Sequence, residues 1–127
     1  PIVKAIFAEL EQDDIPSSVL TDLIKTKVLA LNENESSKLL EYCSSKLRNN
    51  PNEEKNYNIF HKLIEVNVPN AVFYYKEVLE SVKTSNIPPA IGVNLQQFAE
   101  HPDLKEFLAT LFEKDNTPAA KAFKIKD

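Results

Sequence analysis

Residues 104–112 have the sequence LKEFLATLF, and the spacing of their apolar side chains is typical of an α-helix. Leu104, Phe107, Leu108, Leu111 and Phe112 fall at positions i, i+3, i+4, i+7 and i+8. On a helix these positions form one stripe along one side, which a globular protein buries against its core. The stretch therefore predicts an amphipathic helix.

The same spacing recurs along almost the whole chain, and strand-like alternation nowhere replaces it. Proline and asparagine clusters interrupt the pattern, and they mark helix ends because the residue before a proline disfavours helical backbone. The breaks fall at Ile15-Pro16, Asn32–Asn34, Asn49-Asn50-Pro51, Val68-Pro69, Ser85–Pro89 and His101-Pro102. Gly92 is the only glycine, which argues against an all-β fold with its glycine-rich turns.

The predicted fold class is all-α, with six or seven short amphipathic helices joined as antiparallel hairpins. Two architectures fit this pattern: a right-handed superhelical stack of the armadillo or HEAT kind, or a closed helical bundle. No sequence signature repeats at a fixed spacing, whereas the similar helix lengths favour the stack. We expect one domain over residues 1–116, followed by a short terminal helix or a flexible tail over 117–127.

Three local expectations follow from the breaks. Residues 17–31 are predicted to form one helix whose apolar stripe includes Val28 and Leu31. The two prolines at 88–89 predict an extended connector. Pro102 is expected at the first position of the next helix, where its missing N–H is not needed.

Composition restricts the functional classes. The 127 residues carry a net charge of −4, which disfavours indiscriminate binding to nucleic acid because that needs a concentrated basic surface. No stretch approaches the ~20 apolar residues of a membrane span. The single cysteine excludes an intramolecular disulfide and fits a reducing compartment. We therefore expect a soluble intracellular protein, cytoplasmic or nuclear.

No catalytic, cofactor or metal motif is recognisable. Cys43 shares an apolar helical face with Leu39, Leu40 and Leu47, so we interpret it as an inert core thiol. His61 and Glu65 stand four residues apart, but a zinc site needs more ligands, and we interpret them as a solvent-facing pair. The sequence predicts no enzyme, no cofactor and no metal.

One tripeptide resembles a known motif. His101-Pro102-Asp103 matches the tripeptide with which J-domains stimulate Hsp70 ATPases. In a J-domain a long basic helix precedes the tripeptide, whereas residues 93–100 contain neither lysine nor arginine. We therefore interpret this tripeptide as a turn between two helices.

The run Val72-Phe73-Tyr74-Tyr75 is the most informative irregularity. At ~100° per residue these side chains point around most of a helix, so they cannot all face the core of a surface helix. The pattern places Val72 and Tyr75 inward, with Leu79 and Val82. Phe73 then points away from the core, and Tyr74 lies to the side with Val78. The competing interpretation is a central helix that is buried all round. Exposed aromatic residues are favoured anchors at protein interfaces.

The resulting hypothesis is a non-enzymatic protein–protein interaction module, an adaptor or scaffold, that binds another protein through Phe73, Tyr74, Tyr57 and His61. The alternative is a helical carrier of an apolar ligand such as a lipid. Two charged segments suggest further contacts. The acidic run over residues 9–14 is a potential site for a basic partner, and Lys121, Lys124 and Lys126 allow weak membrane or RNA contact.

Overall fold

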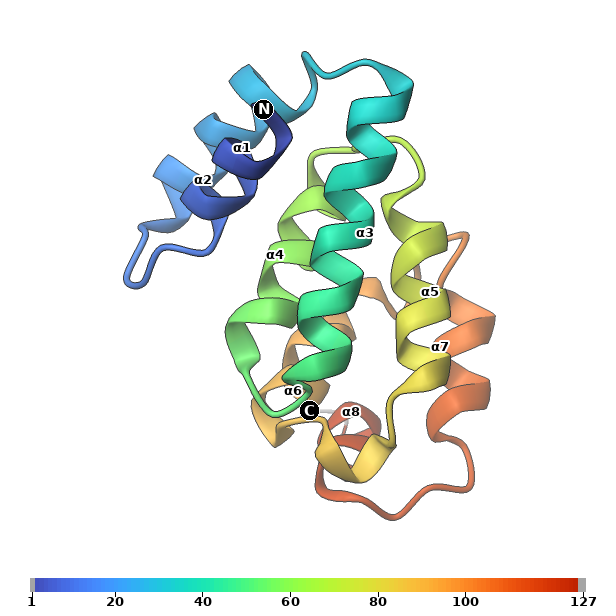
Figure 1. Cartoon of the computed structure of the whole chain (residues 1–127). Coiled ribbons are helices and arrows are strands. Elements are labelled where there is room, and N and C mark those ends of the chain that lie inside the picture. Colours follow the sequence, from blue (N-terminus) through green and yellow to red (C-terminus); the bar gives the residue numbers. More distant parts are fainter. Residues whose placement is uncertain (1, 126–127) are drawn as a thin grey trace.

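The computed structural model describes residues 2–125, and this part of the chain is helical throughout, without a strand (Figure 1). The all-α prediction is confirmed. The described residues form eight α-helices and three short segments of other helical types: α1 (Ile2–Leu10), α2 (Ser17–Leu23), η1 (Ile24–Val28), α3 (Glu33–Asn49), α4 (Glu54–Glu65), α5 (Ala71–Ser81), η2 (Thr84–Asn86), α6 (Pro89–Leu95), η3 (Gln96–Phe98), α7 (Lys105–Phe112) and α8 (Pro118–Lys124).

The helices pack mainly against their second neighbours in the sequence. Helix α3 contacts α1 and α5, α4 contacts α6, and α6 contacts α8. In Figure 1, α1, α3, α5 and α7 follow one another from left to right across the molecule. Contacts of α4 with both α3 and α5 join this row to the helices behind it.

Helix α4 lies at the centre of the protein. Its buried residues occupy most of its circumference and include both apolar and polar side chains: Asn56, Tyr57, Ile59, Phe60, His61, Leu63 and Ile64. The rings of Phe60 and Tyr75 stack with their centroids 5.0 Å apart, which ties α4 to α5. Helix α4 is therefore buried over more than half of its circumference, with Glu54 and Glu65 exposed on the remaining side, whereas α5 exposes Phe73.

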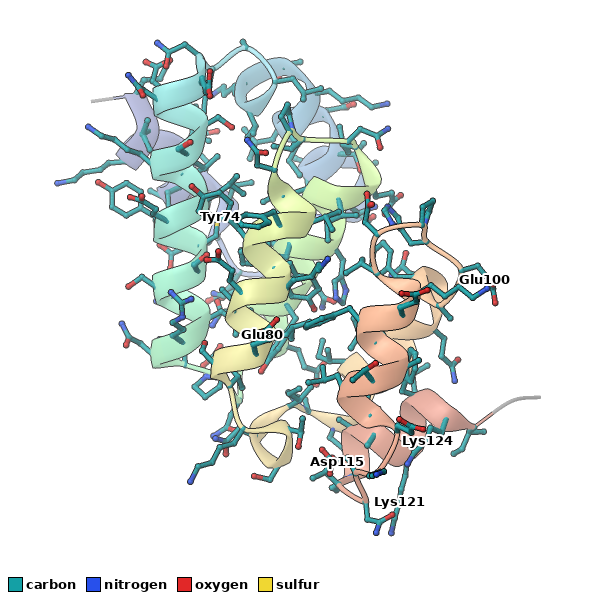
Figure 2. The ribbon with its side chains drawn as sticks, turned by 90° about the vertical axis from the view of Figure 1, so that its right-hand side faces the viewer. Tyr74, Glu80, Glu100, Asp115, Lys121 and Lys124 are labelled. Atoms are coloured by element: carbon teal, nitrogen blue, oxygen red, sulfur yellow. The ribbon has the colours of Figure 1, made fainter. Side chains whose placement is uncertain are left out.

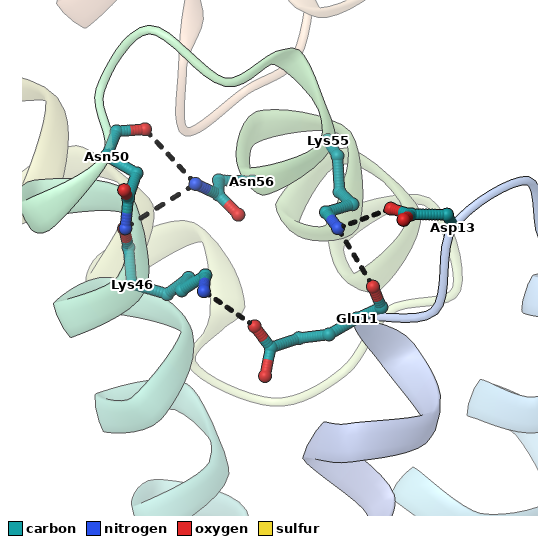
Figure 3. A network of polar contacts seen from close by, with 6 residues as sticks. All are labelled: Glu11, Asp13, Lys46, Asn50, Lys55 and Asn56. Carbon is teal, nitrogen blue, oxygen red and sulfur yellow. Dashed lines mark hydrogen bonds and ion pairs between the residues drawn. The ribbon is translucent and has the colours of Figure 1, made fainter.

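The acidic residues that end α1 are paired within the protein. Glu9 contacts Lys27 at 2.9 Å, and Figure 3 shows the two further pairs, Glu11 with Lys46 at 3.0 Å and Asp13 with Lys55 at 2.9 Å. The Lys55 ammonium also donates to the backbone carbonyl of Glu11 and lowers the pKa of the Asp13 carboxyl by hydrogen bonding and charge. Exposed pairs of this kind stabilise a fold only slightly. The three pairs join the end of α1 and the residues after it to η1, α3 and α4. Three of the acidic side chains in the run 9–14 therefore already have a basic partner within the protein.

A buried amide caps the C-terminal end of α3. The Asn56 Nδ2 donates to the backbone carbonyl of Asn50 at 3.1 Å, and a longer contact of 3.5 Å reaches the carbonyl of Lys46 (Figure 3). The last carbonyls of a helix lack partners within the helix, and burial without a partner is costly. Asn56 thus adds from α4 a second donor to the Asn50 carbonyl, which also accepts from the Glu53 N–H at 3.2 Å.

Replacing Asn56 with alanine is expected to lower the free energy of unfolding by roughly 1 kcal/mol, because the Asn50 carbonyl loses one of its two donors and keeps only the Glu53 N–H. Urea unfolding followed by circular dichroism measures the change. The matched control is Asn52→Ala at an exposed position of the same connection, where a change below about 0.5 kcal/mol is expected. Equal stability of the two variants would mean that the cap contributes nothing.

The single helix predicted over residues 17–31 is interrupted. Helix α2 ends at Leu23 and continues as a π-helical turn over Ile24–Val28, in which the Leu29 N–H donates to the Ile24 carbonyl at 3.0 Å. Ile24 and Val28 are buried, as the apolar stripe predicts, while Leu31 is only partly buried. The wider turn keeps both side chains facing the core although the helix type changes.

Two proline segments also differ from expectation. The connector before α6 begins with a 3-10 turn over Thr84–Asn86. Ile87, at φ −73° and ψ 124°, and Pro88, at φ −60° and ψ 142°, have the predicted extended backbone, and Pro89 is already the first residue of α6. Pro102 lies in a turn, and α7 begins three residues later at Lys105. The His101 Nδ1 accepts from the Asp103 N–H at 3.1 Å, so a side-chain hydrogen bond shapes this turn before the helix starts.

The segment after residue 117 forms helix α8 through Lys124, so its helical alternative is the one observed. The Thr117 hydroxyl caps the N-terminus of α8, and Ala119 and Ala120 are fully buried against α6. Gln96 lies in η3, which directly follows α6, and its Nε2 donates to the backbone carbonyls of Ala122 and Ile125. The last helix is thus part of the packed fold.

Candidate interaction surface

The exposed side of α5 carries Phe73. The buried stripe of this helix consists of Ala71, Tyr75, Val78 and Leu79. Val72, which the sequence pattern places in this stripe, is only partly buried, and Val78 is buried instead. Phe73 points away from that stripe and is 60% exposed, and it is the only phenylalanine among the exposed large apolar residues of 2–125. The predicted exposure of Phe73 is confirmed.

Tyr74 occupies a different position from Phe73. It packs partly buried against the core, on the side of α5 that faces α3 (Figure 2). Its ring meets the Phe73 ring edge to face, with centroids 6.3 Å apart. Tyr74 therefore supports Phe73 from one side and offers only part of its own ring to solvent.

Phe73 separates two hollows in the surface. The hollow between α3 and α5 has a volume of about 310 Å³, and Glu41, Arg48 and Glu77 line it together with the two aromatic rings. The second hollow, about 440 Å³, lies between Phe73 and the turn at His101 and includes Lys76. A projecting ring between two depressions is a shape that a second protein surface can enclose.

Charge is unevenly distributed around Phe73. Glu41 and Glu77 line the α3 side, where the Arg48 Nε is already committed to the Ser81 hydroxyl at 3.0 Å. On the other side the Lys76 ammonium lies 5.9 Å above the Phe107 ring. The buried Ser44 hydroxyl, which also lines the α3 side, has no hydrogen-bond partner within residues 2–125. A partner with basic and hydrogen-bonding groups would therefore complement the α3 side best.

The structure places Tyr57 and His61 in the core, so their assignment to this surface is wrong. Tyr57 is 0% exposed, and its hydroxyl donates to the Pro51 carbonyl at 2.5 Å. His61 is 4% exposed, and its Nε2 lies 2.6 Å from the Tyr75 hydroxyl. Their helix α4 is covered by neighbours on several sides, which its sequence pattern alone does not reveal.

The burial of His61 also corrects its interpretation as half of a solvent-facing pair with Glu65. Glu65 is exposed and contacts Lys62 at 3.5 Å. Desolvation lowers the pKa of His61 from 6.5 to about 4, so its ring is neutral at pH 7. Within the described part of the chain, no cluster of three or more His, Cys, Asp or Glu side chains is placed to hold a metal ion.

Cys43 lies in the core, as predicted. It is 3% exposed, and burial, with a smaller contribution from the Glu11 charge, raises its pKa to about 12. The thiolate is the reactive form of cysteine, and it is scarce at neutral pH when the pKa is this high. Cys43 is therefore a poor nucleophile.

The C-terminal lysines are spread over α8 and beyond. Lys121 and Lys124 lie in its last turn (Figure 2), and the Lys124 ammonium donates to the Asp115 carbonyl at 2.7 Å. Lys126 lies outside the described residues. One of the two described lysines is thus engaged within the protein.

Comparison with known proteins gives no further assignment. The chain has no significant match to a protein-family model, a curated protein or a solved structure. Among the helices of residues 2–125, none combines the length and the apolar character needed to cross a bilayer. The surface around Phe73 therefore has to be interpreted from its own geometry.

Proposed function

We propose that this protein is a non-enzymatic protein–protein interaction module that binds its partner through the surface centred on Phe73. The observation that carries the proposal is the exposure of this phenylalanine, 60%, on the outer side of a helix whose opposite side is fully packed. Exposed aromatic side chains that fit between partner groups contribute strongly to binding. The two hollows beside Phe73 provide room for such groups.

The platform that presents this surface is, in our proposal, a right-handed superhelical stack of hairpins like those of armadillo and HEAT proteins. Contacts of α1 with α3, α3 with α5, α4 with α6, and α6 with α8 support it, because stacked hairpins pack each helix on the equivalent helix of the next hairpin. In such a stack α3 and α5 lie in one layer and together form a broad, rigid surface.

The partner that fits best is a protein segment with an apolar side chain for the Phe73 ring and a basic side chain for the α3 side. Glu41 and Glu77 are the groups that would attract the basic residue, because these two carboxylates outnumber the single Arg48 guanidinium, which keeps its charge while its Nε donates to Ser81. The alternative function, a carrier of an apolar ligand, has no comparable support. The buried aromatic rings contact one another, as Phe112 contacts Phe123 with ring centroids 5.1 Å apart.

Replacing Phe73 with alanine is expected to weaken partner binding at least tenfold, which corresponds to about 1.4 kcal/mol, while changing the free energy of unfolding by less than about 0.5 kcal/mol. The measurement is quantitative mass spectrometry of proteins captured from cell extract by the wild type and by the variant. Phe73 is preferable to Tyr74 for this test because Tyr74 packs against the core.

The matched control is Val93→Ala, which shortens an apolar side chain of similar exposure, 53%, on α6. Proteins that bind through the proposed surface should be lost with Phe73→Ala and retained with Val93→Ala. If both variants capture the same proteins as the wild type, or if Phe73→Ala lowers stability by more than 1 kcal/mol, the proposed surface is wrong.

A further inference from the structure

A groove runs along α4 on the side away from Phe73. A hollow of about 450 Å³ lies between α2, α4 and η3 with the end of α6, and a smaller hollow of about 190 Å³ lies beside the end of α1. Ile15, Leu20 and Asn58 line both hollows, so the two lie next to each other along α4. Along α4 the lining extends from Lys55 to Glu65, which at ~1.5 Å per residue is about 15 Å. An extended polypeptide advances ~3.3 Å per residue, so the groove accommodates four or five of its residues.

Two side-chain amides meet in the middle of this groove. The Asn94 Nδ2 donates to the Asn58 Oδ1 at 3.2 Å across the space between α6 and α4. A single hydrogen bond between two carboxamides uses one donor and one acceptor, so the Asn58 amide group and the Asn94 carbonyl keep hydrogen-bonding capacity. Neither of these two atoms has a protein partner within residues 2–125, and the same holds for the Gln97 amide beside them.

The surroundings favour an uncharged, hydrogen-bonding ligand. Lys62 and Glu65, the two charged residues that line the larger hollow, pair with each other at 3.5 Å. His61 forms part of the wall with a neutral ring, and its buried Nδ1 has no partner within the described residues. The smaller hollow contributes apolar lining from Leu10, Leu20 and Ile59. Two charged residues also line it: Lys55, which is paired with Asp13, and Asp14 at its edge.

We propose that this groove binds an extended segment of another polypeptide by its backbone. In an extended segment the N–H and the C=O of one residue point to the same side of the backbone, and the pair Asn58–Asn94 offers the complementary acceptor and donor. Side chains of an extended segment alternate between two sides, so a neighbouring apolar side chain enters the end lined by Leu10, Leu20 and Ile59. This site shares no lining residue with the hollows beside Phe73 and is therefore a second, separate site.

The test begins with random seven-residue peptides displayed on phage and selected on the full chain. Enriched peptides are synthesised with a fluorophore, and their binding is measured by fluorescence anisotropy. We expect Asn58→Leu and Asn94→Leu to weaken binding at least tenfold. The controls Asn52→Leu, at an exposed asparagine outside the groove, and Phe73→Ala should remain within twofold of the wild type.

A second measurement uses the wild-type protein only, so it does not depend on the folding of a variant. Methylating each backbone nitrogen of the best peptide in turn should weaken binding at least tenfold at one central position, because the methyl group removes the N–H donor. Failure to enrich any peptide, binding by the Asn58→Leu and Asn94→Leu variants that equals binding by the wild type, or tolerance of methylation at every position would overturn the proposal. Peptides lost only with Phe73→Ala would overturn it while supporting the surface around Phe73.

Discussion

Replacing Gly92 with alanine is expected to destabilise the protein by about 3 kcal/mol, near the upper end for overpacking a core. A Cβ atom at residue 92 would lie 2.2 Å from the backbone oxygen of Ala119 and 3.0 Å from its carbonyl carbon. Gly92 lies inside α6 and Ala119 at the start of α8, so the atom in the way belongs to the backbone of another helix. Relief therefore requires the two helices to move apart, and their buried residues lose contact.

The sign of the stability change in Gly92→Ala distinguishes an effect of packing from an effect of helix propensity. An alanine in the interior of an exposed helix stabilises it by ~1 kcal/mol relative to glycine. If propensity determined the outcome, Gly92→Ala would raise the stability of the protein. Urea unfolding of Gly92→Ala and of the wild type decides between the two signs, with Val93→Ala, one residue further along α6, as the control for an ordinary change on the same helix.

The loss of α8 contacts in Gly92→Ala should also be visible locally. Hydrogen exchange of the α8 amides, capped by Thr117 at one end and Gln96 at the other, should accelerate more than exchange in α3. Unchanged exchange in α8, together with unchanged stability, would show that α6 and α8 are less closely packed than the structure has them.

The second large effect is a loss of stability in mild acid caused by His61. Desolvation holds the pKa of His61 at about 4 in the folded protein, against 6.5 in an unfolded chain. Above pH 6.5 the ring is neutral in both states, so the stability is greatest there. Between pH 6.5 and 4 the unfolded chain takes up a proton that the folded protein does not, and the free energy of unfolding falls. The expected total loss is roughly 3 kcal/mol at pH 4, where it levels off.

Other groups with shifted pKa values act in a different pH range. Lys55 lowers the pKa of Asp13, and the Thr84 hydroxyl lowers that of Asp115, both from the ordinary value of 3.8. The stabilisation from these carboxyls is present above pH 3.8 and is lost as the pH falls through their lowered values. The interval from pH 6.5 to 4 therefore belongs mainly to His61, and urea unfolding at half-unit steps across it measures the slope.

Variants of the buried pair test this assignment. His61→Leu should flatten the profile between pH 6.5 and 4, because no histidine is left to titrate at this position. At pH 7 this substitution should lower the free energy of unfolding by about 2 kcal/mol, since the Tyr75 hydroxyl is left buried without its partner. Tyr75→Phe should cost a similar amount.

The double variant His61→Leu/Tyr75→Phe removes both polar groups. Its loss in the free energy of unfolding should therefore be smaller than the sum of the losses in the two single variants, by at least about 1 kcal/mol. Additive losses would mean that the 2.6 Å contact does not couple the two side chains. An acid slope that survives in His61→Leu would assign the pH dependence to another group.

The helices and most of their inward-facing residues follow from the spacing of apolar side chains. Leu104, Leu108 and Phe112 are buried as the pattern of residues 104–112 requires, and the exposure of Phe73 follows from the same reasoning on α5. Cys43 is buried for the same reason, because a residue within an apolar stripe shares the environment of its neighbours. These properties are local: each depends on the period of the helix and on a few adjacent residues.

The position of α4 could not be obtained in this way. A helix with one apolar stripe has the same sequence pattern whether its polar side faces water or a further helix that offers hydrogen-bond partners. The burial of His61 and Tyr57 is made less costly by Tyr75, which pairs with the His61 Nε2 from α5, and by the Pro51 carbonyl in the turn before α4, which accepts from the Tyr57 hydroxyl. Such pairings join residues from separate elements, so no local period reveals them.

Gly92 shows the same difference between what the local sequence predicts and what tertiary packing determines. Ile91, Leu95 and Phe98 fall at positions i, i+4 and i+7, a spacing that predicts a helix here. In an isolated helix a glycine only lowers the stability. The approach of the Ala119 backbone, 27 residues further along the chain, makes the absence of a side chain a requirement. Periodicity thus specified an all-helical protein and which side of most helices turns inward. Which helices meet, and consequently which polar residues are covered, was settled by packing between distant segments, because a buried polar group or a missing side chain is stable only where a particular neighbour complements it.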